Sequence, residues 1–200
     1  MKSHQIIIFA SGSGSNAENL ITYFSAKTYN LNWVIYTNNE NAGVIERAKK
    51  LKVKYKIFDR DKLYSGAILK SINLLNPKLI ILAGFLLKFP EEIVNIYYKK
   101  IINIHPALLP KYGGKGMYGM RVHKAVIDNK ETISGITIHY INSNYDEGPV
   151  IFQKKVKIDP LDSAKDLANK IHTLEMEYFP KIIEKLIMRR YMWRIMIVNI

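Results

Sequence analysis

Residues 5–24 of the chain read QIIIFASGSGSNAENLITYF. The first six residues, Gln5–Ala10, are almost wholly apolar and are bounded by serine and glycine, as in a short strand that is covered on both faces. A loop of Ser, Gly and Asn follows at Ser11–Asn16, and Ala17–Phe24 has the pattern of a helix. A buried strand, a short loop and a helix in this order predict the start of a parallel α/β sheet.

The same alternation continues through the first half of the chain. Further strands are predicted at Trp33–Thr37, Lys54–Phe58, Leu79–Ala83 and Ile101–Ile104. Helices are predicted at Val44–Leu51, over the helical spacing of Leu63, Ala67, Ile68, Ile72 and Leu75, and at Glu91–Tyr98. The predicted fold class is therefore α/β, with a doubly wound, Rossmann-like, mostly parallel sheet.

The pattern changes after Pro106. A glycine-rich loop, Lys111–Met120, precedes a helix predicted at Val122–Ile127. Ser134–Ile141 and Val150–Ile158 then alternate between apolar and polar residues, which is typical of half-exposed antiparallel strands.

A closing helix is the last predicted element. Ser163, with Asp166 three residues on, is expected to cap it. The helix runs through Leu174 toward Phe179, and Pro180 starts or kinks the next segment. No repeat or linker interrupts the chain, so residues 1–200 are expected to form a single domain.

Composition limits the classes of function. The formal net charge is +13, the hydrophobic fraction is 48%, and there is no cysteine, which excludes disulfides and thiolate metal sites. The lysines are scattered, which favours a solvated surface that attracts small anionic substrates over a nucleic-acid surface. We therefore predict small-molecule partners, no nucleic acid, and a monomer or homodimer.

Membrane and export signals are not recognisable in the sequence. The apolar segment Tyr191–Ile200 is too short to span a bilayer and carries Arg194, so we expect it to pack on the domain or on a neighbour. A cytoplasmic protein without membrane association is the prediction.

The segment Asn103-Ile104-His105-Pro106 follows directly on a predicted strand. Asn103 and His105 are two residues apart, so both side chains lie on the same side of the strand. An amide that donates to a developing oxyanion and an imidazole that moves a proton are what an acyl-transfer site needs. The alternative is that both side chains only satisfy backbone groups where the strand ends.

The loop Ser11–Asn16 lies at the carboxyl end of the first predicted strand, where α/β sheets bind ligands. Its small residues allow close backbone approach, and amides at a helix N-terminus attract anions. It lacks the Gly-Lys-Ser/Thr ending of triphosphate loops and the third glycine of dinucleotide loops. We predict a phosphate-binding loop and no nucleoside triphosphate, with a flexible turn as the alternative.

Four motifs occur in a distinctive order: the loop with Asn16, Leu82-Ala83-Gly84-Phe85, the run NIHPALLPKY from Asn103, and DEGPV from Asp146. Together they resemble the phosphoribosylglycinamide formyltransferase family, from residue 6 to about residue 187. The resemblance implies transfer of the formyl group of 10-formyltetrahydrofolate, as co-substrate, to the amine of N1-(5-phosphoribosyl)glycinamide in de novo purine (IMP) biosynthesis. It implies neither a metal nor ATP.

The resemblance also implies roles for individual residues. Asn103, His105 and Asp146 match the family's catalytic three, and Asp146 would stabilise a charged His105 if the turn before Gly148 folds back over it. Taken alone, Asp146 is better explained as a turn aspartate before Gly-Pro, and its combination with the other motifs favours the catalytic role. The substrate phosphate and ribose would be held by Gly14, Ser15, Asn16 and Glu175.

The pterin pocket would be lined, largely through backbone, by Leu86, Leu87, Lys88, Phe89, Asn103, Ile141 and Asn142. Leu87 departs from an arginine common in the family, and either Arg60 or Lys62 could supply a cation for the folate. The loop Gly113–Gly119 is expected to be a mobile flap. His123 and His139 are expected to be structural and have no metal-ligand spacing, so we predict no metal.

Three rival functions remain open. The methionyl-tRNA enzyme shares the catalytic core but carries a further C-terminal domain. Formyltetrahydrofolate hydrolase shares the core but has an N-terminal regulatory domain. A basic, non-enzymatic nucleic-acid-binding protein is the third and belongs to a different class.

Overall fold

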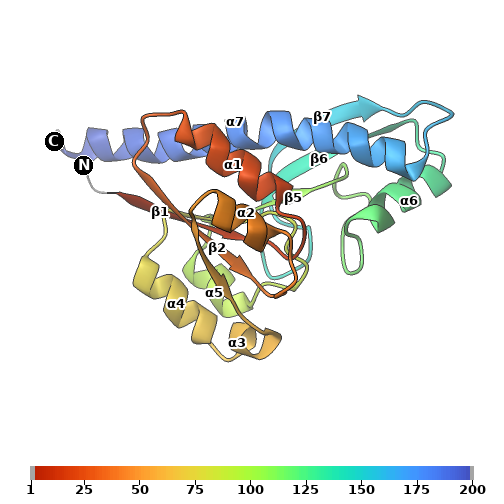
Figure 1. Ribbon diagram of the computed structural model, residues 1–200. Coiled ribbons are helices and arrows are strands. Elements are labelled where there is room, and N and C mark those ends of the chain that lie inside the picture. The colour runs from red at the N-terminus through yellow and green to blue at the C-terminus, as the bar shows by residue number, and fades with distance from the viewer. Residues whose placement is uncertain (1–2, 199–200) are drawn as a thin grey trace.

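The computed structural model describes residues 3–198, and their side chains as far as residue 188. A seven-stranded sheet in the order β3-β2-β1-β4-β5-β6-β7 forms its centre (Figure 1). The strands are β1 His4–Phe9, β2 Leu31–Thr37, β3 Lys54–Ile57, β4 Leu79–Leu82, β5 Ile101–His105, β6 Ile133–Tyr140 and β7 Val150–Lys157. β1 to β5 pair in parallel and β6 and β7 are antiparallel, so the predicted fold class is confirmed.

Helices cover both faces of the sheet (Figure 1). Those whose buried residues share the first core are α1 Ser15–Ser25, α2 Val44–Lys50, α6 Met120–Asp128 and α7 Ala164–Val198. Those of the second core are α3 Arg60–Tyr64, α4 Ala67–Leu75 and α5 Glu91–Ile96. Alternation along β1 makes this division, because Ile6 and Ile8 enter the first core while Ile7 and Phe9 enter the second.

The single helix predicted across residues 63–75 is wrong. Gly66 has a φ of 81° and separates α3 from α4. A left-handed residue cannot continue an α-helix, and glycine adopts that conformation without a steric penalty. The helical spacing of apolar residues was preserved across the break because Leu63 and Ile68 both enter the second core.

The closing helix is longer than predicted and continues through Pro180. A proline inside a helix leaves the carbonyl four residues earlier without its usual donor. Here the backbone oxygen of Met176 accepts a hydrogen bond of 2.8 Å from Asn19 Nδ2 on α1. At the start of α7, Ser163 and Asp166 form the predicted reciprocal cap, with Ser163 N donating to Asp166 Oδ2 over 2.9 Å.

The order in which strands are added to the sheet reverses at β1, and this places the ligand-binding crevice. β2 lies on one side of β1 and β4 on the other, so the connections after β1 and β4 part at the carboxyl edge. Ser11 N donates to Gly84 O over 3.0 Å and joins the two connections at their base. Of the helices within residues 3–198, none has the length and apolar character needed to cross a bilayer. The predicted packing of Tyr191–Ile200 concerns side chains outside the described residues.

Candidate active site

Asn103 and His105 lie at the carboxyl end of β5. Their neighbours Ile102 and Ile104 enter the first core, so Asn103 and His105 point to the opposite face. His105 is 3% exposed. Its Nε2 lies 2.8 Å from the backbone oxygen of Tyr112. Because a carbonyl oxygen only accepts, Nε2 carries a hydrogen and donates it.

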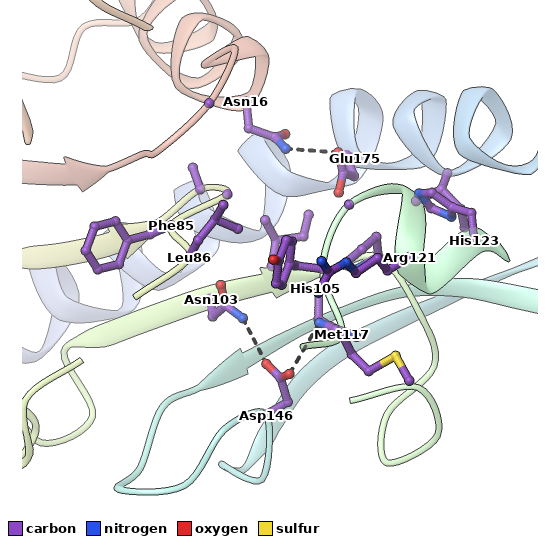
Figure 2. A pocket seen from close by; sticks show the side chains of 18 of the residues that line it. Asn16, Phe85, Leu86, Asn103, His105, Met117, Arg121, His123, Asp146 and Glu175 are labelled. Atoms are coloured by element: carbon purple, nitrogen blue, oxygen red, sulfur yellow. Dashed lines mark hydrogen bonds and ion pairs between the residues drawn. The ribbon is translucent and has the colours of Figure 1, made fainter. Parts of the chain in front are cut away.

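Asp146 comes from the connection between β6 and β7 and contacts both β5 side chains (Figure 2). Its Oδ2 lies 3.6 Å from His105 Nδ1 and accepts a hydrogen bond of 2.9 Å from the backbone of Gly114. Its Oδ1 accepts a longer bond of 3.4 Å from Asn103 Nδ2. The carboxylate therefore faces the imidazole nitrogen that is not bonded to the backbone.

His139 of β6 lies directly opposite Asn103 in the antiparallel ladder. Its Nδ1 donates to the backbone oxygen of Tyr140 over 2.9 Å, so its Nε2 accepts from Asn103 Nδ2 over 3.1 Å. Burial lowers the pKa of His139, which keeps the ring neutral and able to accept. His139 thus fixes the orientation of the Asn103 carboxamide.

The Ser/Gly loop is held between α1 and α2. Arg47 Nε donates to the backbone oxygen of Ser13 over 2.8 Å, and its guanidinium pairs with Glu18 in the first turn of α1. Gly14 has a φ of 77°, and a Cβ there would lie 2.4 Å from Val44 Cγ2. Glycine is therefore required where the two helices approach. The first amides of α1, with a guanidinium nearby, form a site for an anion.

Glu175 reaches the start of α1 from α7. Its Oε2 accepts a hydrogen bond of 2.9 Å from Asn16 Nδ2 and lies 3.7 Å from His172 Nδ1 (Figure 2). Hydrogen bonding to Glu175 raises the pKa of His172, and burial opposes this rise. The site thus places an acceptor for hydroxyl groups beside the anion-binding loop.

A cavity of about 690 Å³ joins these groups. It is lined by the Ser/Gly loop and Glu175, by Asn103, His105 and Asp146, and by the glycine-rich loop before α6. Its volume lies within the roughly 300–1,000 Å³ of typical small-molecule sites. Among the described side chains, no group of three or more His, Asp or Glu is arranged to hold a metal ion.

Comparisons with known proteins identify the family. The formyl transferase family model matches residues 4–183. The phosphoribosylglycinamide formyltransferase of Bacillus subtilis is 32% identical over 90% of this chain and 93% of its own length. The chain belongs to the phosphoribosylglycinamide formyltransferase family. A chloroplastic phosphoribosylglycinamide formyltransferase from Arabidopsis thaliana is also 32% identical, over 95% of this chain and 68% of its own length.

Solved formyltransferase structures share the fold. The phosphoribosylglycinamide formyltransferase of Anaplasma phagocytophilum superposes with a TM-score of 0.82 at 30% identity, covering 92% of this chain and 86% of its own. That of Streptococcus pneumoniae TIGR4 gives a TM-score of 0.81 at 28% identity, covering 94% and 99%. The resemblance inferred from the four motifs is therefore confirmed.

Most of the residues predicted for this formyltransferase's catalytic and substrate sites lie together. Asp146 contacts both Asn103 and His105, and all three line the cavity. The predicted substrate residues line the same cavity: Gly14, Ser15, Asn16 and Glu175. Their roles stay predictions, but their proximity does not depend on the resemblance.

The predicted folate residues are more dispersed. Leu86 lines the cavity, whereas Leu87, Lys88, Phe89, Ile141 and Asn142 do not. Phe89 is 5% exposed and packs edge-on against Phe9 in the second core, so its side chain is not available to a ligand. Neither candidate cation lines the cavity, since Arg60 lies over the ring of Tyr64 and Lys62 pairs with Asp59.

The expectation that His123 and His139 are structural stays a prediction, but the structure places both of them at the site. His139 contacts Asn103 and lies 3.7 Å from Asp146, and His123 lines the cavity. Strand pairing could have identified His139, because it faces Asn103 across the ladder. No signal in the sequence distinguishes the cavity side of α6 from its core side, and His123 was missed for this reason.

Proposed function

We propose that this chain transfers the formyl group of 10-formyltetrahydrofolate to the amine of N1-(5-phosphoribosyl)glycinamide in de novo purine (IMP) biosynthesis. One observation carries the proposal: the Ser/Gly loop at the start of α1 and the His105 imidazole line the same cavity. A phosphorylated amine needs both, since its phosphate must be held while its nitrogen reacts. Membership of the formyltransferase family supplies the reaction class.

In this proposal the substrate lies with its phosphate at Gly14, Ser15 and Asn16. Loop amides and the positive end of α1 stabilise the phosphate charge. Glu175 accepts hydrogen bonds from the ribose hydroxyls. The glycinamide then extends toward β5, where the amine meets the formyl carbon.

Negative charge develops on the formyl oxygen as the amine attacks, and Asn103 is proposed to donate to it. Asn103 Nδ2 has two hydrogens, one bonded to His139 over 3.1 Å and one in the longer 3.4 Å contact with Asp146. The second is the weaker contact and is the one exchanged for the oxyanion. Such a donor stabilises charge that is absent in the ground state.

His105 is proposed to accept the proton that the amine loses and to deliver it to the folate nitrogen, which is the leaving group. Its Nδ1 lies 3.6 Å from Asp146 Oδ2, too far for a short hydrogen bond, so a proton there remains accessible to the substrate. Asp146 stabilises the charged ring during the transfer. The reaction requires neither metal nor nucleoside triphosphate in this scheme.

The pterin is proposed to lie against Leu86 and the backbone of the segment that follows it. Leu87, Lys88, Phe89, Ile141 and Asn142 complete the proposed pocket, with Asn103 at its inner end. A cytoplasmic location and a monomeric or homodimeric state also stay predictions.

The test is a choice among formyl acceptors. We expect formylated nucleotide from phosphoribosylglycinamide and a 10-formylfolate without ATP or added metal, and no transfer to charged tRNA or to water. Turnover that requires ATP and free formate would contradict the proposal.

A companion variant, His105→Ala, should lower kcat by roughly 10²-fold or more with little change in substrate affinity. The control is Leu161→Ala, at a residue that is 96% exposed before α7. It should leave kcat unchanged.

A further inference from the structure

His123 is a buried histidine whose polar atoms the proposed reaction scheme leaves unused. It lies in the first turn of α6, is 6% exposed, and lines the cavity (Figure 2). Its Nδ1 is buried and has no hydrogen-bond partner within the described part of the chain. A buried polar atom without a partner costs free energy, so such an atom on a residue that lines a cavity indicates a missing ligand.

The other acceptors at this part of the cavity already have partners. Asp146 accepts from Gly114 and Asn103 and faces His105. Glu175 accepts from Asn16. Two buried acceptors on residues that line the cavity have no partner in the described part of the chain, Asn16 Oδ1 in the Ser/Gly loop and His123 Nδ1. Because Asn16 lies at the proposed phosphate and ribose end, an N–H donor of a ligand near Asn103 and His105 would find its vacant acceptor at His123.

The position of His123 narrows the part of the ligand that it meets. His123 lines the same cavity as Glu175, the proposed ribose contact, and His105, the proposed proton carrier. Both residues also act electrostatically on the His123 ring. The glycinamide of the proposed substrate must cross this region. The terminal amine of the glycinamide carries more N–H donors than its amide does.

We infer that His123 is a substrate-contacting residue whose Nδ1 accepts a hydrogen bond from the amine of the glycinamide and holds the nucleophile beside Asn103 and His105. This inference rests on the proposed function. The two histidines have different environments, since His105 Nδ1 lies 3.6 Å from an oxygen of Asp146, whereas His123 has no carboxylate within ion-pair distance among the described residues and is affected by Glu175 only from farther away. His105 is suited to carry a charge and His123 to accept a hydrogen bond.

The protonation state of His123 agrees with this role. Burial lowers the pKa of its imidazole, so the ring is neutral at pH 7. A neutral ring can accept from the amine, whereas a charged ring at the same place would repel the ammonium form. Acceptance of a hydrogen bond also orients the nitrogen for attack.

The first test replaces His123 by leucine, which fills the space without a polar atom. We expect KM for phosphoribosylglycinamide to rise roughly tenfold, the loss of one good hydrogen bond, with KM for the formylfolate unchanged. The melting temperature should stay equal or rise, because a buried unpartnered nitrogen is removed. Equal kinetic constants in the variant and the wild type would overturn the inference.

Two further variants separate a ligand role from a structural one. His123→Asn keeps an acceptor close to the Nδ1 position and should recover part of the affinity, while failure to recover any would overturn the acceptor role. Val126→Ala, on the same helix and 1% exposed, should lower stability without changing KM. A rise in KM for this control as large as that of His123→Leu would mean that helix disturbance explains both.

Calorimetric titration then identifies the contacted group. Phosphoribosylacetamide lacks only the amine, so wild type and His123→Leu should bind it equally. An equal loss of affinity for both ligands in the variant would overturn the assignment to the amine. Absence of formyl transfer by the wild-type enzyme would instead refute the proposed function.

Discussion

Gly14→Ala is the substitution whose effect the structure defines best. Gly14 begins α1 with a φ of 77°, in the left-handed region, and it lies against α2. An alanine Cβ would stand 2.4 Å from Val44 Cγ2, 2.5 Å from its Cβ and 2.7 Å from its Cα. The last of these is a backbone atom, so no side-chain rotation relieves the clash. α1 and α2 must move apart.

Two contributions set how much the free energy of unfolding falls in Gly14→Ala. A left-handed conformation costs a residue with a Cβ about 1–2 kcal/mol. Forcing an extra carbon into a packed interior costs about 1–3 kcal/mol. The sum is roughly 2–5 kcal/mol, a large share of the roughly 5–15 kcal/mol of a typical domain.

The assay is urea denaturation followed by circular dichroism, beside steady-state kinetics. Movement of α1 shifts the amides that are proposed to bind phosphate, so KM for phosphoribosylglycinamide should rise more than KM for the formylfolate. Gly12→Ala is the matched control in the same loop, because a Cβ at Gly12 meets no atom within 4 Å. It should stay within about 0.5 kcal/mol of wild type.

A rescue variant tests whether the contact with Val44 causes the loss of stability. Val44→Ala in the Gly14→Ala background removes the Cγ2 contact but leaves the clashes with Cβ and Cα, so recovery should be partial. Equal unfolding free energies for Gly14→Ala and Gly12→Ala would refute the argument, as would full recovery in the double variant.

Three further predictions concern charge. Asp146→Asn keeps the shape but removes the carboxylate, so kcat should fall by roughly 10²-fold at pH 7 in the formyl-transfer assay; an unchanged kcat would rule out its electrostatic role. Burial lowers the pKa of His123 and His139, so between their folded values and about 6.5 the unfolded chain binds more protons. The free energy of unfolding should therefore fall as pH drops below about 6.5, and denaturation curves should show a smaller fall when both are replaced by leucine. Arg47→Met should raise KM for the phosphorylated substrate several-fold with kcat retained, since it braces the Ser/Gly loop; Lys49→Met, an exposed cation on the same helix, should have no effect.

The central strands of the sheet could be predicted because burial on both faces leaves a recognisable pattern in the sequence. Ile6–Ile8 and Leu79–Leu82 are continuous apolar runs, and strands buried on both faces require such runs. The helix across residues 63–75 could not be predicted correctly by the same means. Its apolar spacing survives the break at Gly66, so periodicity alone did not reveal the break.

Near the site, some side-chain positions could also be predicted from local sequence and others could not. Asn103 and His105 could be placed on one side of a strand, because alternation is a local property. The role of Asn19 in bonding the carbonyl freed by Pro180 depends on contact between α1 and α7, which no local pattern contains. His123 differs from a core histidine only in what its ring faces.

The sequence by itself determined the fold class, the position of the Ser/Gly loop after the first strand and the amide–imidazole pair, since each depends on residues close together in the chain. Only the tertiary structure decided that Asp146 faces His105, that His139 orients Asn103, and that Glu175 meets Asn16 across 159 positions. Contacts between distant segments depend on how the helices and strands pack. The packing is a property of the whole chain, and the site exists only once it is complete.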